Sequence, residues 1–253
     1  MSQAPTIVVT GGARRIGAAI CRRFASEGWH VVIHCNTSRE AAEALAAELP
    51  DAEVVACDLT DLDAAHDMIV DLAARLPDWR VLVNSASVFR PDDVGTLDPM
   101  TNREAMRVNA VAPALMTYAF LHAARSKTGR RAIQITDQKL ANPNPDFFSY
   151  TMSKHALAGT VPMMAMAADP GDRIYALAPG AILASHDQSA EEAEESHRLN
   201  LLERRTAARE VADAAWFLAT GPLDSGETLF VDSGQHLLNQ PRDVIFLARE
   251  RAE

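Results

Sequence analysis

The amino-acid sequence predicts one α/β domain, in which helices cover both faces of a doubly wound parallel sheet of about seven strands. Short β-branched runs alternate with amphipathic stretches along the whole chain. These runs are apolar throughout, which is typical of strands that are buried on both faces. No linker-like stretch or internal repeat interrupts the order, so we expect residues 1–253 to form a single domain.

The expected strands are the runs rich in Val and Ile, each too short for a helix and followed by a polar or glycine-containing stretch. The first two, "TIVVT" and "HVVIHC", contain almost no charge. The last, "ETLFVDSG", ends at a glycine. In chain order the strands are expected at residues 6–10, 30–35, 52–58, 80–86, 131–137, 173–180 and 227–234.

The expected helices are the longer stretches between these strands, because their apolar residues recur at the three- and four-residue spacing of one helix face. "SREAAEALAAELP" and "LDAAHDMIVDLAARLP" show this spacing between charged residues. Connections of this length favour right-handed βαβ units and hence a parallel sheet. The helices are expected at residues 16–28, 38–50, 62–77, 103–126, 149–168 and 207–220.

Two segments depart from the alternation. Residues 184–206 are acidic and weakly apolar, and they are either a solvated helix or, as we expect, a substrate lid near the strand ends. Residues 235–253 form a C-terminal tail that is either a frayed end or a docking arm. Because Val244, Ile245, Phe246 and Leu247 make the tail too apolar for a free end, we expect it to pack on its own core or on a neighbouring subunit.

Composition argues against several classes of partner. With 34 acidic and 24 basic residues the net charge is −10, and no Lys/Arg block offsets it, so we expect neither nucleic acid nor an anionic membrane as a partner. The N-terminus has no signal-peptide pattern and no apolar run could span a bilayer, which predicts a soluble, cytoplasmic protein. Cys21, Cys35 and Cys57 are odd in number and widely spaced, so we expect buried thiols and no metal.

The stretch "TIVVTGGARRIGAAI" contains a strand, a glycine turn and the start of a helix, in that order. Gly11, Gly12 and Gly17 allow a tight turn and close approach to a pyrophosphate, which the N–H groups and dipole of the following helix attract. On the first βα unit, this pattern favours dinucleotide binding in a Rossmann-type fold over a purely structural turn.

The end of the second strand indicates which dinucleotide is bound. "HCNTSRE" has no carboxylate before Glu40, whereas Arg39 offers a cation and Arg14 lies in the glycine turn. A guanidinium pairs with a 2′-phosphate that a carboxylate would repel, so we infer NADPH. The alternative is that Arg39 is only a solvated helix residue. Asp58, which closes the third strand, either accepts from the adenine amino group or caps the next helix.

"SYTMSK" places Tyr150 one helical turn before Lys154, so that the two side chains share a helix face. The pair is either an exposed surface contact or a proton-transfer device. A tyrosine has an unperturbed pKa of about 10 and needs a nearby cation to exchange protons near neutrality. Lys154 supplies that cation, and we favour the proton-transfer interpretation.

With "TGGARRIG", "NSAS", Asn109, "SYTMSK" and "APG" in this order, the chain resembles the short-chain dehydrogenase/reductase family over almost its whole length. The resemblance implies that Tyr150 donates a proton, that Lys154 holds the nicotinamide ribose and favours the tyrosinate, and that Asn109 anchors a water relay to Lys154. It also implies a homotetramer. The expected cofactor contacts are Gly11, Arg14, Arg15, Ile16, Gly17, Asn36, Thr37, Ser38, Arg39, Asp58, Leu59, Asn84, Ala86, Pro179 and Gly180.

Three positions depart from the usual pattern of that family. Asp137 stands where a substrate-binding serine is expected, Arg15 replaces the middle glycine of the turn, and Ala184 replaces a threonine after the Pro-Gly bend. In all three the chain resembles the pteridine reductase branch, which includes dihydromonapterin reductases. The alternative for Asp137 is that it merely caps the loop that follows.

"LVNSASVFR" resembles the same branch. The resemblance implies that Ser87 contacts a pterin, that Phe89 stacks on it, and that Arg15 bridges the pterin and the cofactor pyrophosphate. Together with Asp137 and Tyr150 these residues are the expected substrate contacts. Core packing for Phe89 and simple phosphate binding for Arg15 are the alternatives. The expected function is NADPH-dependent reduction of a pterin C=N bond, the alternatives being a carbonyl or ketoacyl reductase and a non-catalytic NADPH-binding regulator.

Overall fold

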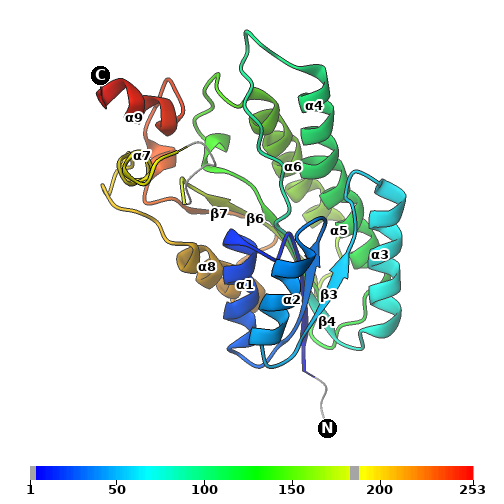
Figure 1. Cartoon of the computed structure of the whole chain (residues 1–253). Coiled ribbons are helices and arrows are strands. Elements are labelled where there is room, and N and C mark those ends of the chain that lie inside the picture. Colours follow the sequence, from blue (N-terminus) through cyan, green and yellow to red (C-terminus); the bar gives the residue numbers. More distant parts are fainter. Residues whose placement is uncertain (1–3, 183–187, 253) are drawn as a thin grey trace.

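The structure is a computed structural model that describes residues 4–182 and 188–252 (Figure 1). Within these residues seven parallel strands form one sheet in the order β3-β2-β1-β4-β5-β6-β7. The order reverses between β1 and β4, as the predicted doubly wound sheet requires. The strands are β1 (Thr6–Thr10), β2 (His30–Cys35), β3 (Ala52–Ala56), β4 (Trp79–Asn84), β5 (Arg131–Ile135), β6 (Arg173–Pro179) and β7 (Thr228–Val231).

Helices cover both faces of this sheet, which confirms the predicted fold class. One face carries α1 (Arg15–Ala25), α2 (Arg39–Glu48) and α8 (Ala208–Thr220). The other carries α3 (Leu62–Arg75), α5 (Ala112–Ala123) and α6 (Phe148–Ala167), with α4 (Pro99–Met106) packed on α6. No helix among residues 4–182 and 188–252 is both long enough and apolar enough to cross a membrane.

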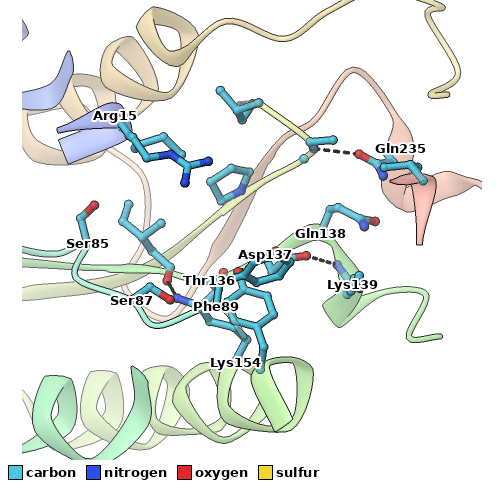
Figure 2. Close-up of a pocket in the computed structure, with 18 of the residues that line it drawn as sticks. Arg15, Ser85, Ser87, Phe89, Thr136, Asp137, Gln138, Lys139, Lys154 and Gln235 are labelled. Carbon is cyan, nitrogen blue, oxygen red and sulfur yellow. Dashed lines mark hydrogen bonds between the residues drawn. The ribbon is translucent and has the colours of Figure 1, made fainter. Parts of the chain in front are cut away.

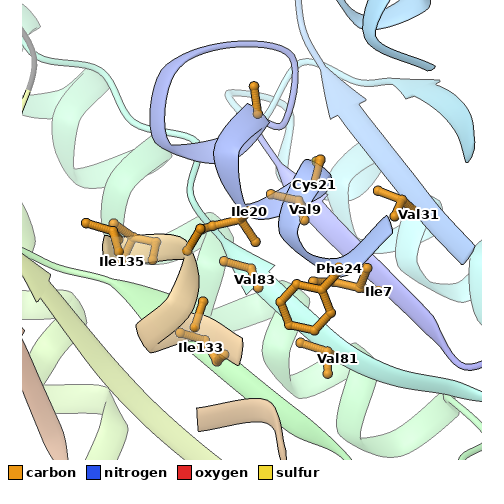
Figure 3. Close-up of a cluster of buried hydrophobic side chains, with 14 of the residues drawn as sticks. Ile7, Val9, Ile20, Cys21, Phe24, Val31, Val81, Val83, Ile133 and Ile135 are labelled. Carbon is orange, nitrogen blue, oxygen red and sulfur yellow. The ribbon is translucent and has the colours of Figure 1, made fainter. Parts of the chain in front are cut away.

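Successive side chains of the central strands enter two different cores. Ile7 and Val9 pack with α1 on one face, and Val8 packs with α3 and α5 on the other. Figure 3 shows the first core, where Ile20 and Phe24 of α1 lie over the sheet. Each buried side chain of this size stabilises the fold by roughly 1.5–3 kcal/mol. This double burial explains why the strands read as continuous apolar runs.

The stretch predicted as one helix at residues 103–126 is divided in the structure. Helix α4 begins earlier, at Pro99, because the side chain of Asp98 accepts hydrogen bonds from the amides of Met100 (3.3 Å) and Thr101 (2.9 Å). A π-helical turn, η1 (Arg107–Val111), then joins α4 to α5. Such turns have no reliable sequence pattern and are often found at functional sites.

Beyond the strand ends lie α7 (Ala190–Ser196) and the helix of the C-terminal tail, α9 (Val244–Ala252), which pack on each other (Figure 1). Arg249 of α9 pairs with Glu192 of α7 at 2.8 Å. Val244 and Ile245 are buried against this chain. The short helices η2 (Gln138–Leu140) and η3 (Gln235–Leu237) contact each other at the same end of the sheet.

Candidate active site

A cavity of about 360 Å³ opens at the carboxyl ends of the strands, where ligands bind in doubly wound folds (Figure 2). Segments far apart in the sequence line it, from the glycine turn to the C-terminal tail. The sequence-predicted residues that line it are Gly11, Arg14, Arg15, Ile16, Gly17, Ala86, Ser87, Phe89, Asp137, Tyr150, Lys154, Pro179 and Gly180.

The glycine turn has no room for side chains. Gly11 has a φ of +62°, and a Cβ on it would lie 2.8 Å from the Cα of Ala86. A Cβ on Gly17 would lie 2.3 Å from the carbonyl oxygen of Gly11. Arg14, the N-cap of α1, makes no side-chain capping bond within the described chain. The first turn of α1 therefore has amide groups available for an anion.

Arg15 follows this turn in the left-handed conformation, with a φ of +55°. The family pattern has glycine here, and glycine adopts this conformation without strain. For arginine it costs on the order of 1 kcal/mol. The side chain lines the cavity (Figure 2). A strained residue in a ligand cavity indicates a functional role for that side chain.

The buried side chain of His34 in β2 is hydrogen-bonded to the glycine turn. Its Nδ1 accepts a hydrogen bond from the amide of Gly11 at 3.2 Å, and its Nε2 lies 3.0 Å from the carbonyl oxygen of Cys57. The proton is therefore on Nε2, which donates to Cys57. Burial lowers the pKa of His34 to about 4, so the ring is neutral near pH 7. The sequence analysis missed this connection between β1, β2 and β3.

The residues expected around the adenosine end lie outside the lining of this cavity. Asn36, Thr37 and Arg39 are exposed, and Arg39 pairs with Glu43 at 2.8 Å. Ser38, the N-cap of α2, and Leu59, which is buried, also lie outside the cavity lining. Their contacts with NADPH stay predictions.

Asp58 does not cap the next helix. Its carboxylate accepts from the amide of Thr60 at 2.9 Å, and Asp61 is the N-cap of α3, accepting from Ala64 at 3.0 Å. The capping alternative for Asp58 is wrong, because the helix begins one turn later than that interpretation requires. Asp58 is exposed, and its predicted contact with adenine stays open.

Asp137 and Tyr150 form the polar centre of the cavity. The Tyr150 hydroxyl donates to Oδ2 of Asp137 at 2.8 Å, and the amide of Lys139 donates to Oδ1 at 2.9 Å. Burial raises the pKa of Asp137 against the opposing charge of Lys139. Burial also raises the pKa of Tyr150 well above its usual value, and the neighbouring Asp137 carboxylate adds to the effect. The two groups titrate as one coupled pair.

Lys154 lies beside this pair. Its Nζ donates to the carbonyl oxygen of Ile135 at 2.7 Å and lies 5.5 Å from the centre of the Tyr150 ring. Burial lowers the pKa of Lys154 to about 8, and Asp137 opposes that shift. We expected a lysine cation to lower the pKa of Tyr150. In the structure the net shift is upward, because burial and the Asp137 carboxylate act in the opposite direction.

Phe89 forms an aromatic wall next to Tyr150. Its ring stacks on Phe147 with a centroid distance of 4.2 Å and meets the Tyr150 ring edge-on at 4.7 Å. Phe89 is 38% exposed, which does not fit the core-packing alternative. Phe147 precedes α6 with a φ of +52°. The loop before α6 thus places the Phe147 ring against Phe89, which in turn contacts Tyr150 of α6.

Two predicted asparagines are not among the residues that line the cavity. The side chain of Asn84 is buried and donates to Thr117 and Gln134, each at 3.0 Å, while Ser85 lines the cavity instead. Asn109 in the π-helical turn bonds to both backbone groups of Val88, at 2.8 and 2.9 Å. Among the described residues Asn109 hydrogen-bonds to Val88 and Ser153, and the Nζ of Lys154 hydrogen-bonds to Ile135, so the water relay stays a prediction.

Of the segment expected to be a lid, residues 184–187 lie outside the described residues, and with them Ala184. The remainder contains α7, after which His197 lines the cavity. Burial lowers the pKa of His197. That this segment moves stays a prediction.

The sequence analysis missed Lys139, Gln235 and Asp243, which line the same cavity. Lys139 stands in "TDQKL", close after Asp137, and the start of a polar stretch was the only signal for it. Gln235 accepts from the amide of Ala181 at 3.0 Å. Asp243 precedes the apolar run of the tail, a position typical of a helix N-cap and not of a binding site.

Comparison with known proteins identifies the family. The family model described as "Enoyl-(Acyl carrier protein) reductase" matches residues 11–236. The chain belongs to the short-chain dehydrogenase/reductase family.

Members of this family with several activities resemble the chain. A "putative ketoacyl reductase 2" of the granaticin polyketide synthase from Streptomyces violaceoruber is 29% identical, over 93% of this chain and 98% of its own length. A dihydromonapterin reductase from Citrobacter koseri is 26% identical, over 91% and 96%. The crystal structure of FolM alternative dihydrofolate reductase 1 from Brucella canis, complexed with NADP, is similar with a TM-score of 0.87 and 33% identity, over 94% and 96%.

As a short-chain dehydrogenase/reductase the protein is an oxidoreductase. Its cavity combines an anion-binding turn, a coupled Asp–Tyr pair and a buried lysine. Such a set of groups can hold a dinucleotide next to a proton donor. The similarity to the dihydromonapterin and dihydrofolate reductases supports the resemblance to the pteridine reductase branch.

Proposed function

We propose that the protein reduces a pterin-type C=N bond with NADPH as the cofactor. The observation that carries this proposal is the 2.8 Å hydrogen bond from Tyr150 to Asp137, a carboxylate at the position where a carbonyl reductase of this family presents a hydroxyl. The relatives named as dihydromonapterin reductase and alternative dihydrofolate reductase support it.

The residues at the glycine turn fit a dinucleotide. A Cβ at Gly11 or Gly17 would fill the space at the start of α1, where the amides of the first turn and the positive helix end favour a pyrophosphate. Arg14 lines the cavity, and Arg39, an exposed residue that pairs with Glu43, offers a second cation for a 2′-phosphate. Bound there, NADPH supplies the hydride.

The chain itself supplies the proton. When a hydride reaches the carbon of a C=N bond, the adjacent nitrogen gains electron density and must take a proton. The Tyr150 hydroxyl, bonded to Asp137 in the cavity, has a pKa raised well above its usual value by burial, so it keeps its proton near pH 7. The Lys154 ammonium stabilises the negative charge that remains on Tyr150 after the proton has left, because its Nζ lies beside the Tyr150 ring.

Aromatic and charged groups support binding of a flat, polar heterocycle. Phe89 presents an exposed ring next to Tyr150, and Ser87 and Arg15 line the same cavity. A carboxylate at Asp137 can accept from ring N–H and amino groups, whereas it would repel the electron-rich oxygen of a ketone. These features together favour a pterin over a simple carbonyl compound.

A carbonyl or ketoacyl reductase is the second candidate, and the 29% identity with a putative ketoacyl reductase favours it. To separate the two, the loss of NADPH absorbance is followed with dihydrobiopterin, dihydrofolate and a panel of ketones. We expect the highest kcat/KM with a pterin, and turnover lower by about two orders of magnitude or more in Tyr150→Phe, the matched control. Preference for ketones would select the second candidate, and no oxidation with either substrate class would favour the NADPH-binding regulator.

We also propose that the protein forms a homotetramer in the cytoplasm. Large apolar side chains on α5 and α6 are exposed in the single chain, and Tyr118, Met163 and Met166 are more than half exposed. A surface of this kind supports an interface between copies of the chain. Light scattering of the purified protein tests the tetramer, and cell fractionation followed by immunoblotting tests the location.

A further inference from the structure

The C-terminal tail brings a carboxylate to the reaction cavity. Asp243, at the start of α9, lines the cavity with Val244 and Ile245. The tail is held there by two further contacts. Arg242 pairs with the carboxylate of Asp146 at 2.9 Å, and the amide of Asp243 donates to the same carboxylate at 2.7 Å. Asp243 is thus fixed in position, although it lies far from Asp137 in the sequence.

Asp243 forms a buried ion pair with Lys139. Their charged atoms are 2.7 Å apart, and the side chains are only 10% and 5% exposed. Lys139 also donates to the carbonyl oxygen of Asp146 at 3.3 Å and lies over the ring of Phe147. Buried ion pairs contribute little net stability, because desolvation offsets the attraction between the charges. The position of this pair inside the reaction cavity therefore points to a role in the chemistry of the cavity.

Lys139 connects this ion pair to the proton-transfer residues. Its backbone amide donates to one carboxylate oxygen of Asp137 at 2.9 Å, and Tyr150 donates to the other at 2.8 Å. Figure 2 shows Lys139 and Asp137 joined in this way on the same short turn. Any shift of Lys139 consequently moves the carboxylate that bonds to Tyr150.

We propose that Asp243 and Lys139 are positioning residues that set how strongly the Asp137–Tyr150 pair holds its proton. This inference rests on the proposed function, in which that pair delivers a proton to the substrate. Asp243 opposes loss of the proton and Lys139 favours it. The balance of the two charges sets the pH above which the Asp137–Tyr150 pair has lost its proton.

Charged groups of the described residues face the pair from every element around it. Lys139 of η2, Lys154 of α6 and Arg15 of the glycine turn are cations, and Asp243 is the anion. Burial raises the pKa of Tyr150 most, followed by the charge of Asp137 and then that of Asp243. The charge of Arg15 lowers it. The charge of Lys139 lowers the pKa of Asp137 against burial.

Two further ionisable groups near the cavity contribute less to this balance. His197 lines the cavity from the end of α7, and burial lowers its pKa. Arg242 neutralises the Asp146 carboxylate at 2.9 Å. Asp243 and Lys139 therefore remain the opposed pair whose charges can be removed one at a time.

The test is the pH dependence of kcat/KM for NADPH-dependent reduction by purified full-length variants. Reduction consumes a proton, so the rate falls as the pair deprotonates at high pH. Asp243→Asn removes a negative charge and should move this alkaline limb down by about one pH unit. Lys139→Met should move it up by about the same amount. The double variant should lie close to wild type, because both charges are gone.

Three controls separate charge from structure. Asp243→Glu keeps the charge and should restore the wild-type limb. Arg249→Met removes the ion pair between α9 and Glu192 of α7 without changing the charges in the cavity, and it should leave the limb in place. Melting curves identify variants that fail to fold, in which case the remaining single variant and the double variant decide.

A readout without substrate separates a failure of this inference from a failure of the proposed function. Tyrosinate absorbance is titrated in the ultraviolet, with Tyr150→Phe subtracted, and Asp243→Asn should lower the midpoint. If wild type reduces no pterin, the proposed function is rejected, yet this titration still tests the pair. The inference would be overturned if the alkaline limb and the tyrosinate midpoint stayed fixed in both Asp243→Asn and Lys139→Met, or if they moved in the same direction in both. A shift of the same size in Arg249→Met would also overturn it.

Discussion

Tyr150 donates its hydroxyl proton to Asp137 at 2.8 Å, so the proton donor of the cavity is hydrogen-bonded to a carboxylate and not to a hydroxyl. A serine can donate to a substrate oxygen at any working pH, whereas an aspartate can donate only when it is protonated. Burial raises the pKa of both Asp137 and Tyr150. Tyr150 therefore holds a proton near neutrality, which suits a ring nitrogen that must be protonated during reduction.

Asp137→Ser should reverse the preference for substrates. We expect pterin reduction to fall roughly tenfold or more, because the serine neither accepts from the pterin N–H groups as a carboxylate does nor holds a proton for it. Reduction of simple ketones should be unchanged or improved. Steady-state kinetics of both substrate classes measures this, with Asp137→Asn as a control that keeps the shape and removes the acid. Unaffected pterin turnover in the serine variant would falsify the role given to Asp137.

Tyr150→Phe should separate binding from chemistry. The variant keeps the ring next to Phe89 but has no hydroxyl to donate. Turnover should fall by about two orders of magnitude or more, the usual size for loss of a general acid. Binding of NADPH, measured by fluorescence titration, should persist. Near-full activity would show that another group donates the proton.

The protein should bind NADPH more tightly than NADH. One charge-assisted pair with the 2′-phosphate corresponds to about 1 to 3 kcal/mol. Arg14→Ala or Arg39→Ala should weaken NADPH binding and leave NADH binding nearly unchanged. Arg22→Ala is the matched control, because it removes an exposed arginine that pairs with Glu48 at 2.8 Å, further along α1. Equal affinities of wild type for both cofactors contradict the prediction.

The fold was predictable because its signals are local. The runs at residues 6–10 and 30–35 coincide with β1 and β2, since burial on both faces requires continuous apolar residues. The division of residues 103–126 was not predictable. It depends on a π-helical turn, in which Asn109 bonds to Val88 of a distant loop. No periodicity of the sequence reports that contact.

The site was predictable only in part. Gly11, Tyr150 and Lys154 belong to short motifs whose spacing carries the chemistry, and all three line the cavity. Asp243 belongs to no motif, and only the path of the tail brings it to Lys139. His34 was missed for a similar reason, because its two partners come from other strands. Long-range contacts of this kind depend on the topology of the fold, and no local sequence pattern predicts them.

His34 predicts a pH dependence of stability. Its pKa is lowered by burial from 6.5 to about 4 in the folded protein. Below pH 6.5 this histidine therefore binds a proton in the unfolded chain but stays neutral in the folded protein. The free energy of unfolding consequently falls as the pH falls towards 4. Between about pH 7 and about pH 5 this histidine should account for a loss of about 2 kcal/mol in the free energy of unfolding.

Urea unfolding at both pH values measures that loss, and His34→Gln is the matched variant. A glutamine amide can accept from Gly11 and donate to Cys57 as the neutral ring does, but it does not titrate. The variant should be less stable than wild type at the higher pH and should lose clearly less stability on acidification. Glu210, whose pKa is lowered to about 2 mainly by Arg204, loses its contribution only at lower pH and does not interfere. Equal losses in the two proteins would mean that His34 is already protonated in the fold, and the neutral hydrogen bond to Gly11 would then be wrong.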